Sequence, residues 1–277
     1  MYRITKVLNH NAVIAVDDET KEYLIMGKGI GFGRKITEEI YPAEGTTMYS
    51  LQSDSERGTA EDIVKQVDPI CLEIADSVLN EAEKNFGKVD RKILFPMADH
   101  LQFAIGRMTN NEKIKNPLTD DIKVLFHVEY KTAEIARKLV EEKFSVTITD
   151  DEVGFLALHV HSAIEDESVS QAMQTAHVIN ECIEAIEKNT GIHLETTSLG
   201  YNRLMNHIRY MVVRMNTGEK LKLDMNDYMK IKYPETFEIA QRICDEMAVS
   251  LKKELQEAEI GYLAMHIERV SGEGLNE

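Results

Sequence analysis

Asp99-His-Leu-Gln-Phe-Ala-Ile-Gly-Arg107 and Glu152-Val-Gly-Phe-Leu-Ala-Leu-His159 are the two segments that decide the fold, because each occurs twice. They return as Asn206-His-Ile-Arg-Tyr-Met-Val-Val-Arg214 and Glu259-Ile-Gly-Tyr-Leu-Ala-Met-His266, in both cases 107 residues later. Similarity at a fixed offset indicates a duplicated structural unit. A unit of about a hundred residues can enclose its own helical core, so the pattern predicts two tandem bundles rather than a solenoid.

Around these segments the apolar residues recur with the period of a helix. One such set is Leu94, Met97, Leu101, Ala104, Ile105 and Met108. Spacing of this kind predicts an amphipathic helix. Thr149 with Glu152 three residues later has the form of a capping box and predicts a helix start. We therefore expect two all-helical modules, residues 59–168 and 169–277, with a polar connector at 164–171.

The sequence pattern of the first fifty residues differs from the rest, because it predicts β-strands instead of helices. Short β-prone runs lie at residues 2–8, 12–16, 23–26 and 46–51, and a polar linker at 52–60 closes a domain of residues 1–58. So small a sheet leaves one face open, and a homodimer is a natural way to cover it. The predicted fold class is mainly α, with a small antiparallel β domain followed by two tandem helical bundle modules.

Composition restricts the function classes. The 277 residues are 43% hydrophobic and 29% charged, which is typical of a globular protein. A net charge of -16 opposes general nucleic-acid binding, which depends on Lys and Arg. Residues 1–35 nevertheless hold six Lys and Arg against four Asp and Glu, so this part could bind one structured RNA.

The cysteines and the apolar runs bear on the compartment. Cys71, Cys182 and Cys244 are dispersed and odd in number, which favours neither a zinc site nor a disulfide framework and fits a reducing cytoplasm. The amino-terminal residues lack the apolar run of a signal peptide, and no apolar run approaches about 18 residues. We expect a cytoplasmic protein without membrane insertion.

Four of the nine histidines occupy equivalent places in the two modules. They are His100 and His159 in the first module, and His207 and His266 in the second. A single histidine beside an apolar helix face is more often a hydrogen-bonded residue at the edge of a core. Repetition at matched positions makes a functional role the better interpretation for these four.

Reversible phosphorylation is the chemistry that these histidines fit best. Zinc would need three or four convergent ligands, and no HExxH or CxxC motif is present, so we expect no metal. General acid–base catalysis would need a recognisable partner motif, so we expect neither catalytic residues nor a cofactor. Phosphorylation needs only an accessible imidazole and adds about two negative charges. Arg107 and Arg214, seven residues after the first histidines, could neutralise that phosphate or simply form salt bridges to glutamates.

The segment Gly27-Lys-Gly-Ile-Gly-Phe-Gly33 superficially resembles a nucleotide-binding loop. No clear helix follows it, which disfavours a dinucleotide-binding unit. Glycines also allow a backbone to approach a ligand closely, Phe32 could stack on a base, and Asn9 and Asn11 could bind base edges. The alternative is a tight turn that places Phe32 in the core.

These motifs, in this order and over nearly the whole chain, resemble the bacterial transcriptional antiterminators of the BglG/SacY/LicT type. That family carries a pattern like Lys6-Val-Leu-Asn-His-Asn11 and Met26-Gly-Lys-Gly-Ile-Gly-Phe32 in its RNA-binding head. Its two regulatory modules contain D-H-x-x-F-A-x-x-R and E-x-G-F-x-A-L-H segments. The segment Leu158-His-Val-His-Ser-Ala163 is most similar to glucose-type members.

The resemblance implies a function and partners. The head is expected to dimerise and to bind an imperfect hairpin in a leader mRNA, so that an overlapping terminator does not form. The resemblance implies that the residues that contact RNA are Asn9, Asn11, Gly27, Lys28, Gly29 and Phe32. The phosphotransferase system, through HPr and a sugar-specific enzyme II component, is expected to phosphorylate His100, His159, His207 and His266.

The sequence departs from some members at two positions. Lys28 stands where several relatives have Arg, which loses bidentate geometry toward a phosphate. Asn206 replaces the aspartate that precedes the first histidine in the first module, so equal reactivity of the modules does not follow.

Two other function classes compete with antitermination. A DNA-binding activator could carry the same modules, although residues 1–58 show no helix-turn-helix pattern. An enzyme that relays phosphate onward through its histidines is the second alternative. Comparing the binding of hairpin RNA with that of duplex DNA distinguishes antitermination from the DNA-binding activator. Transfer of labelled phosphate to an acceptor other than water would support the enzyme.

Overall fold

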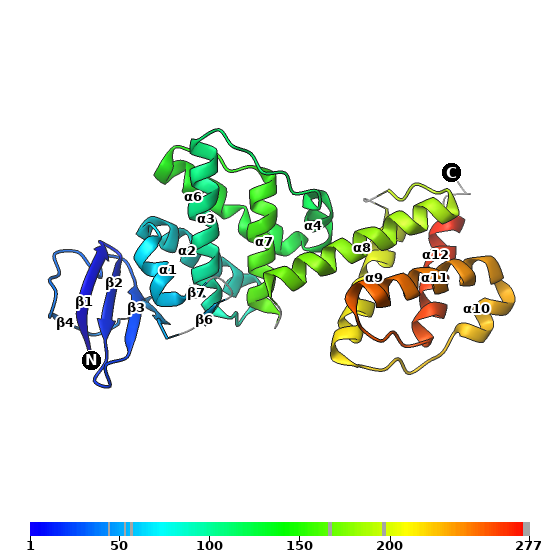
Figure 1. The fold of residues 1–277 in the computed structure, drawn as a ribbon, viewed down its shortest axis with the longest axis horizontal. Helices are drawn as coiled ribbons and strands as arrows, with labels where there is room; N and C mark the ends of the chain where they lie inside the picture. Colours follow the sequence, from blue (N-terminus) through cyan, green and yellow to red (C-terminus); the bar gives the residue numbers. More distant parts are fainter. Residues whose placement is uncertain (44, 53, 56–57, 166–167, 196–197, 274–277) are drawn as a thin grey trace. The chain divides into compact units, whose positions relative to one another are not determined.

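The computed structural model describes residues 1–43, 45–52, 54–55, 58–165, 168–195 and 198–273. It divides the chain into two compact units, Met1–Val169 and Ser170–Glu277 (Figure 1). The first unit contains the β domain and the first helical module, and the second contains the second helical module. Each unit is considered by itself.

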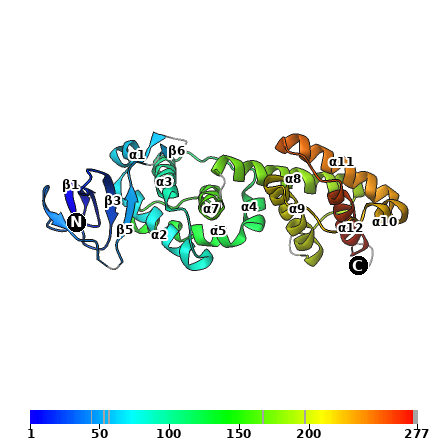
Figure 2. The ribbon, with the colours of Figure 1, turned by 90° about the horizontal axis from the view of Figure 1, so that it is seen from below.

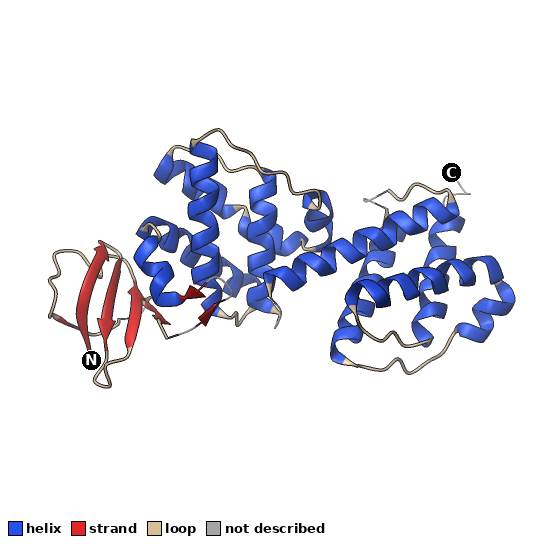
Figure 3. Ribbon diagram, in the orientation of Figure 1, coloured by secondary structure: helices blue, strands red, loops and turns tan. Residues whose placement is uncertain are grey.

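The β domain is a five-stranded antiparallel sheet, shown in red in Figure 3. Its strands are β1 (Tyr2–Asn9), β2 (Ala12–Val16), β3 (Glu22–Met26), β4 (Glu39–Ile40) and β5 (Thr47–Ser50), in the order β4-β1-β2-β3-β5. The pairing of β1 with β2 shifts register between Val7 and Asn9, at the start of the tight turn that joins them. A second, two-stranded sheet pairs β6 (Asp54–Ser55) with β7 (Gly58–Thr59).

The five-stranded sheet is buried on both faces. One face holds a small apolar core of Ile4, Val13, Ala15, Ile25 and Ile40. On the other face Leu24 and Tyr49 are 0% and 3% exposed, and the Tyr49 ring packs edge-on against Phe95 of the first module. This second face is thus covered within the unit, which removes the open face from which a dimer was expected.

The first module is built from α1 (Ala60–Gln66), α2 (Pro69–Phe86), a 3-10 turn η1 (Arg91–Ile93), α3 (Leu94–Thr109), α4 (Thr119–Leu125), α5 (His127–Ala133), α6 (Ile135–Phe144) and α7 (Asp150–Ile164). Helix α2 shows why such segments are helical. Asp68 caps its first turn, Pro69 occupies a position that needs no amide donor, and Gly87 ends it at a positive φ of 84°. Figure 2 shows α2, α3, α5 and α7 gathered into one bundle.

The second module contains α8 (Val169–Thr190), α9 (Leu199–Thr217), α10 (Asn226–Lys232), α11 (Pro234–Leu251) and α12 (Ala258–Glu273). Helix α12 packs against α9, α10 and α11 (Figure 1). Ser198 and Gly218 mark the two ends of α9, the first as a side-chain cap and the second in the left-handed conformation. In the described part of the chain no helix is long and apolar enough to cross a membrane.

The predicted fold class is confirmed, with differences at particular elements. The four predicted strands are present within two residues of their expected ends, and β4 was not predicted because it is only two residues long. Thr149 does cap α7, but the Glu152 carboxylate binds two side chains of α3, as described below. The predicted linker at 52–60 and connector at 164–171 fall partly outside the described residues. Helix α8 already starts at Val169, inside the expected connector.

Candidate functional sites

The turn after β1 and the glycine segment 27–33 form one structure. The Asn9 Oδ1 atom accepts from the Asn11 backbone N–H at 2.8 Å, and the Asn11 Oδ1 atom accepts from the Gly29 N–H at 2.9 Å. Backbone bonds from Gly27 to Asn11 and from Gly31 to His10, each 2.9 Å long, join the two segments. Both asparagine oxygens are thus used inside the loop, which leaves their NH₂ groups to face a partner.

Two glycines in this loop are needed for its shape. A Cβ added to Gly31 would lie 2.2 Å from the Asn9 carbonyl oxygen, so only glycine permits this approach. Gly29 has φ near 73°, a conformation that L side chains rarely adopt. The glycines therefore hold the two asparagines in position rather than bind a nucleotide in a βαβ unit.

Phe32 lies on the surface of the loop and is 70% exposed. The alternative that placed its ring in the core is therefore wrong. The ring meets His10 edge-on at 5.2 Å between centroids, so two aromatic side chains stand together beside Asn9 and Asn11. His10 was not singled out by sequence reasoning, and its place between the two asparagines was the available signal. An exposed aromatic pair beside amide donors is suited to stacking on unpaired bases.

The NH₂ groups of the two asparagines contact the first helical module. Asn9 Nδ2 donates to Glu73 Oε1 at 2.7 Å, and Asn11 Nδ2 donates to Glu73 Oε2 at 3.3 Å. Glu73 belongs to α2. No local sequence pattern indicates this contact, because the partners are 62 and 64 residues apart.

In the first module the structure brings the two predicted histidines together. The rings of His100 in α3 and His159 in α7 lie 5.5 Å apart between centroids. His100 Nε2 is 3.0 Å from Glu152 Oε2, and Arg107 binds the same carboxylate through Nε and Nη2 at 2.8 to 3.0 Å. Of the two roles considered for Arg107, this structure shows the salt bridge.

The Glu152 carboxylate is 0% exposed, yet it is charged. Burial raises the pKa of Glu152, but the hydrogen bonds from His100 and Arg107 lower it by a larger amount. The resulting pKa lies below the ordinary value of a glutamate. An ionised carboxylate can only accept, so His100 donates to it through Nε2.

The second module repeats the pair with one difference. His207 in α9 and His266 in α12 stack at 4.6 Å with an interplanar angle of 20°. Arg214 binds Glu259, but among the described residues His207 Nε2 has no hydrogen-bond partner. Burial, aided by His266 and Arg214, lowers the pKa of His207 to about 3. The modules therefore differ in the hydrogen bonding of their first histidine, in addition to the replacement of aspartate by Asn206.

The expectation that the histidines are accessible is wrong for three of them. His100, His159 and His207 are 8%, 4% and 9% exposed. They meet between two helices of each module, because α3 packs against α7 and α9 packs against α12. Glu152, which binds His100 and Arg107, and Glu259, which binds Arg214, also repeat at the 107-residue offset, and that repetition could have identified them.

The first module also holds a buried pair of one histidine and one glutamate, which the second module does not repeat. His161 Nδ1 lies 3.2 Å from Glu129 Oε1, and both residues are 5% exposed. At the position that matches His161, 107 residues later, the second module has Glu268, which accepts from Thr236 at 2.7 Å. The duplicated helices thus preserve the His100/His159 arrangement but not this one.

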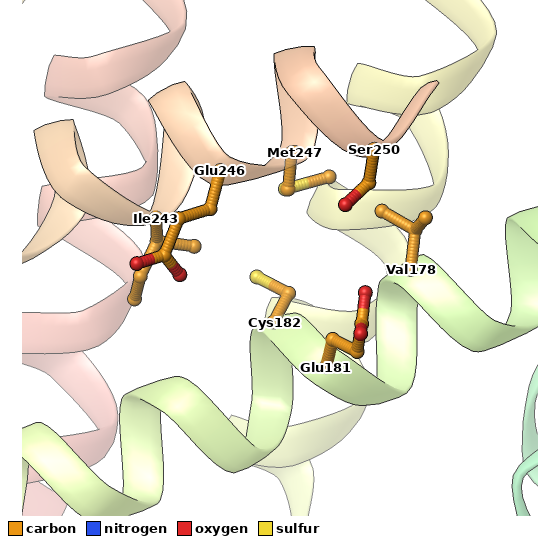
Figure 4. A pocket seen from close by; sticks show the side chains of 7 residues that line it. All are labelled: Val178, Glu181, Cys182, Ile243, Glu246, Met247 and Ser250. Carbon is orange, nitrogen blue, oxygen red and sulfur yellow. The ribbon is translucent and has the colours of Figure 1, made fainter. Parts of the chain in front are cut away.

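A pocket of about 240 Å³ lies in the second unit between α8 and α11 (Figure 4). Its lining includes Glu181, Cys182 and Glu246, and burial raises the pKa of the Cys182 thiol well above its ordinary value. A protonated thiol is a poor nucleophile. Within the described part of the chain, no group of three or more His, Cys, Asp or Glu side chains is placed to hold a metal ion.

Comparison with protein families fits this division into a β loop and two histidine modules. Residues 2–58 match the model of the CAT RNA binding domain, and residues 72–163 and 180–270 each match the PRD domain. The chain belongs to the bacterial transcriptional antiterminators that join a CAT RNA-binding domain to two PRD domains. The β domain is hereafter called the CAT domain, and the helical modules are called the first and second PRD domains.

Individual relatives match over nearly their whole length. Protein GlcT of Staphylococcus saprophyticus is 30% identical over 96% of both chains, and the GlcA/glcB genes antiterminator of Staphylococcus carnosus is 29% identical over 96% of this chain and 94% of that one. Transcription antiterminator LicT of Bacillus subtilis is 26% identical over 97% of this chain and 98% of that one. The crystal structure of GlcT CAT-PRDI, 30% identical, matches 59% of this chain and 98% of its own with a TM-score of 0.50.

Proposed function

We propose that the CAT domain binds an imperfect hairpin in a leader mRNA through Asn9, Asn11, Gly27, Lys28, Gly29 and Phe32, and so prevents a terminator from forming. The observation that carries this proposal is the loop itself. It holds two NH₂ donors outward beside an exposed Phe32, with Lys28 between the glycines to meet phosphate. Stacking and base-edge hydrogen bonds to unpaired bases are the usual mode of sequence-specific RNA recognition.

The four paired histidines are the proposed sites of phosphorylation. His100, His159, His207 and His266 lie in two pairs of neighbouring rings, and a phosphoryl group on any of them would add about two charges between packed helices. Because three of the rings are buried, phosphorylation requires the helices to separate. Phosphate therefore favours an opened PRD domain over the packed one, which is how a local modification changes the whole chain.

HPr and a sugar-specific enzyme II component are the proposed phosphate donors. The chain then acts as a cytoplasmic, non-enzymatic homodimer that carries phosphate as a signal, and its dimer interface lies elsewhere than on the sheet face that Phe95 covers. Its similarity to proteins named GlcT supports a glucose-type subgroup. The proposed domain limits are residues 1–58, 59–168 and 169–277.

Binding of the full chain to a panel of imperfect RNA hairpins, with duplex DNA of the same sequence beside each, tests the function. We expect RNA binding that weakens with salt, because Lys28 neutralises phosphate. Phe32→Ala should weaken binding about 5- to 160-fold, since base stacking contributes ~1–3 kcal/mol. Asn11→Ala should also weaken it. Preference for duplex DNA, or equal binding by all variants, would contradict the proposal.

A further inference from the structure

The two proposed RNA-binding amides are already engaged. Each asparagine uses its side-chain oxygen inside the loop, so its NH₂ group is the part that faces outward. Both NH₂ groups donate to the same carboxylate, Asn9 to one oxygen of Glu73 and Asn11 to the other. A carboxylate offers the same kind of acceptor as a phosphate oxygen or a base carbonyl. The Glu73 carboxylate thus accepts the hydrogen bonds that the two NH₂ groups are proposed to donate to RNA.

The surroundings of this contact also disfavour RNA. A pocket of about 230 Å³ beside it is lined by Asn11, Gly27 and Lys28 from the CAT domain and by Glu73 and Asp76 from α2. Two carboxylates thus share a pocket with the lysine that would meet a phosphate. Like charges repel most strongly where water is partly excluded. The two carboxylates therefore oppose the entry of a nucleic-acid backbone while α2 is in place.

A second set of bonds fixes α2 against the CAT domain. The Tyr49 hydroxyl of β5 donates to Asp76, one turn after Glu73, and Arg91 donates to the Tyr49 oxygen at 3.0 Å and to Asp76 at 3.2 Å. The Tyr49 ring packs on Phe95. Glu73 and Asp76 are three residues apart and share one helix face, so both carboxylates are presented together.

The duplicated module provides an internal comparison. The 104-residue offset that relates Glu83-Lys-Asn85 to Glu187-Lys-Asn189 aligns the buried positions of α2 with those of α8. At this offset Glu73 corresponds to His177, whose side chain is 58% exposed and pairs with Glu181 of its own helix. Asp76 corresponds to Asn180. The two carboxylates are therefore present in the copy that follows the CAT domain and absent at the matched positions of the other.

From these observations we infer that Glu73 is an autoinhibitory residue. Its carboxylate holds the Asn9 and Asn11 amides against α2, and the chain binds RNA only when this contact opens. The inference rests on the proposed RNA function of the CAT domain. It adds a competitor within the chain, so the affinity for RNA depends on the fraction of molecules in which α2 has moved away.

Glu73→Ala tests the inference in the full chain, with Glu81→Ala as the matched control. Glu81 lies on the same helix and carries the same charge, but it pairs with the exposed Lys84. A contact that is closed in about nine molecules of ten weakens apparent RNA affinity about tenfold. We expect Glu73→Ala to bind the best hairpin of the panel about tenfold more tightly than wild type, and Glu81→Ala to bind like wild type. Equal binding by the three proteins would overturn the inference and leave the RNA function intact.

Hydrogen–deuterium exchange without RNA is the second readout. The backbone amides of Asn11 and Gly29 are protected by the asparagine oxygens, which Glu73 helps to hold. These amides should exchange several-fold faster in Glu73→Ala than in wild type and Glu81→Ala. Unchanged exchange would overturn the inference whether or not RNA binds. Faster exchange, with no variant binding any hairpin, would support the Glu73 contact and contradict the proposed RNA function instead.

Discussion

Glu152 holds His100 and Arg107 at once, from a position with no exposure to water. A buried carboxylate is stable only when its oxygens are paired, and removing one partner of such a pair costs about 3–5 kcal/mol. Glu152 therefore fixes both the ring orientation of a proposed phosphorylation site and the packing of α3 on α7.

Replacing Glu152 by Gln should lower the local stability of α3 and α7 by about 3 kcal/mol. This is the low end of the range because the Arg107 side chain is 24% exposed and partly screened. The lowered pKa of Glu152 means that its contribution is present above the unfolded pKa, about 4.3, and is lost as pH falls through the folded value. Amide exchange of the two helices, measured near pH 7 and pH 4, should be less pH-dependent in the variant. An unchanged pH dependence would contradict this role.

His207 should make the second PRD domain sensitive to acid. Its pKa is about 3 in the folded chain and about 6.5 when unfolded, so the unfolded state binds the proton more readily. The stability that depends on neutral His207 is complete above pH 6.5 and is lost progressively as pH falls towards 3. Compared with wild type, His207→Asn should lose less protection in α9 and α12 between pH 7 and pH 5. Equal losses in both proteins would show that another group titrates.

Phosphorylation should follow the paired arrangement rather than surface exposure. His193 is a suitable control because its side chain is 87% exposed and lies outside both pairs. After incubation with phosphorylated HPr, mass spectrometry should find phosphate on His207 or His266 and none on His193. Labelling that is strongest on His193 would mean that exposure alone selects the site.

Among the elements, the loop between β3 and β4 depends most on one glycine. Alanine at Gly31 places a methyl group against the Asn9 carbonyl, so the loop must move away from β1. Gly31→Ala should lose RNA binding even though it removes no group that touches RNA. Gly106→Ala in α3 is the control, because its Cβ meets open space and alanine favours a helix by up to about 1 kcal/mol. If Gly31→Ala binds hairpin RNA like wild type, the proposed geometry of the loop is wrong.

The sequence predicted those elements whose signal is local. Short β-prone runs located the sheet, whereas apolar periodicity, the Thr149 cap and the 107-residue repeat located the bundles and the four paired histidines. β4 escaped prediction because two residues carry no periodicity, and it forms only because β1 offers a free edge. Burial of the histidines was missed for a related reason. It depends on the packing of two helices far apart in sequence.

Contacts between domains were beyond sequence reasoning. Tyr49 was identified only as part of an apolar strand, whereas its ring and hydroxyl join β5 to α2 and α3. Glu73 carries no mark in the sequence, because an acidic residue on a helix is usually a solvated one. Only the folded first unit places it against Asn9 and Asn11.

For the whole molecule, helix α2 connects the proposed signal to the proposed output. It contacts the CAT domain through Glu73 and Asp76, and it packs against α3 and α7, which carry His100 and His159. Separation of α3 from α7 would therefore remove packing partners of α2. A shift of the chain from 1% to 99% active needs about 5.5 kcal/mol of differential stabilisation. Charges introduced into a buried helix interface are able to supply a large part of this energy.

The most direct test of antitermination is single-round transcription through a leader that contains the bound hairpin and its overlapping terminator. The added protein should raise the fraction of transcripts that pass the terminator. The Glu73→Ala protein should do so at about tenfold lower concentration, whereas the Phe32→Ala protein should barely raise that fraction. If the chain binds the hairpin but leaves the fraction of read-through unchanged, it is an RNA-binding protein whose function is not antitermination.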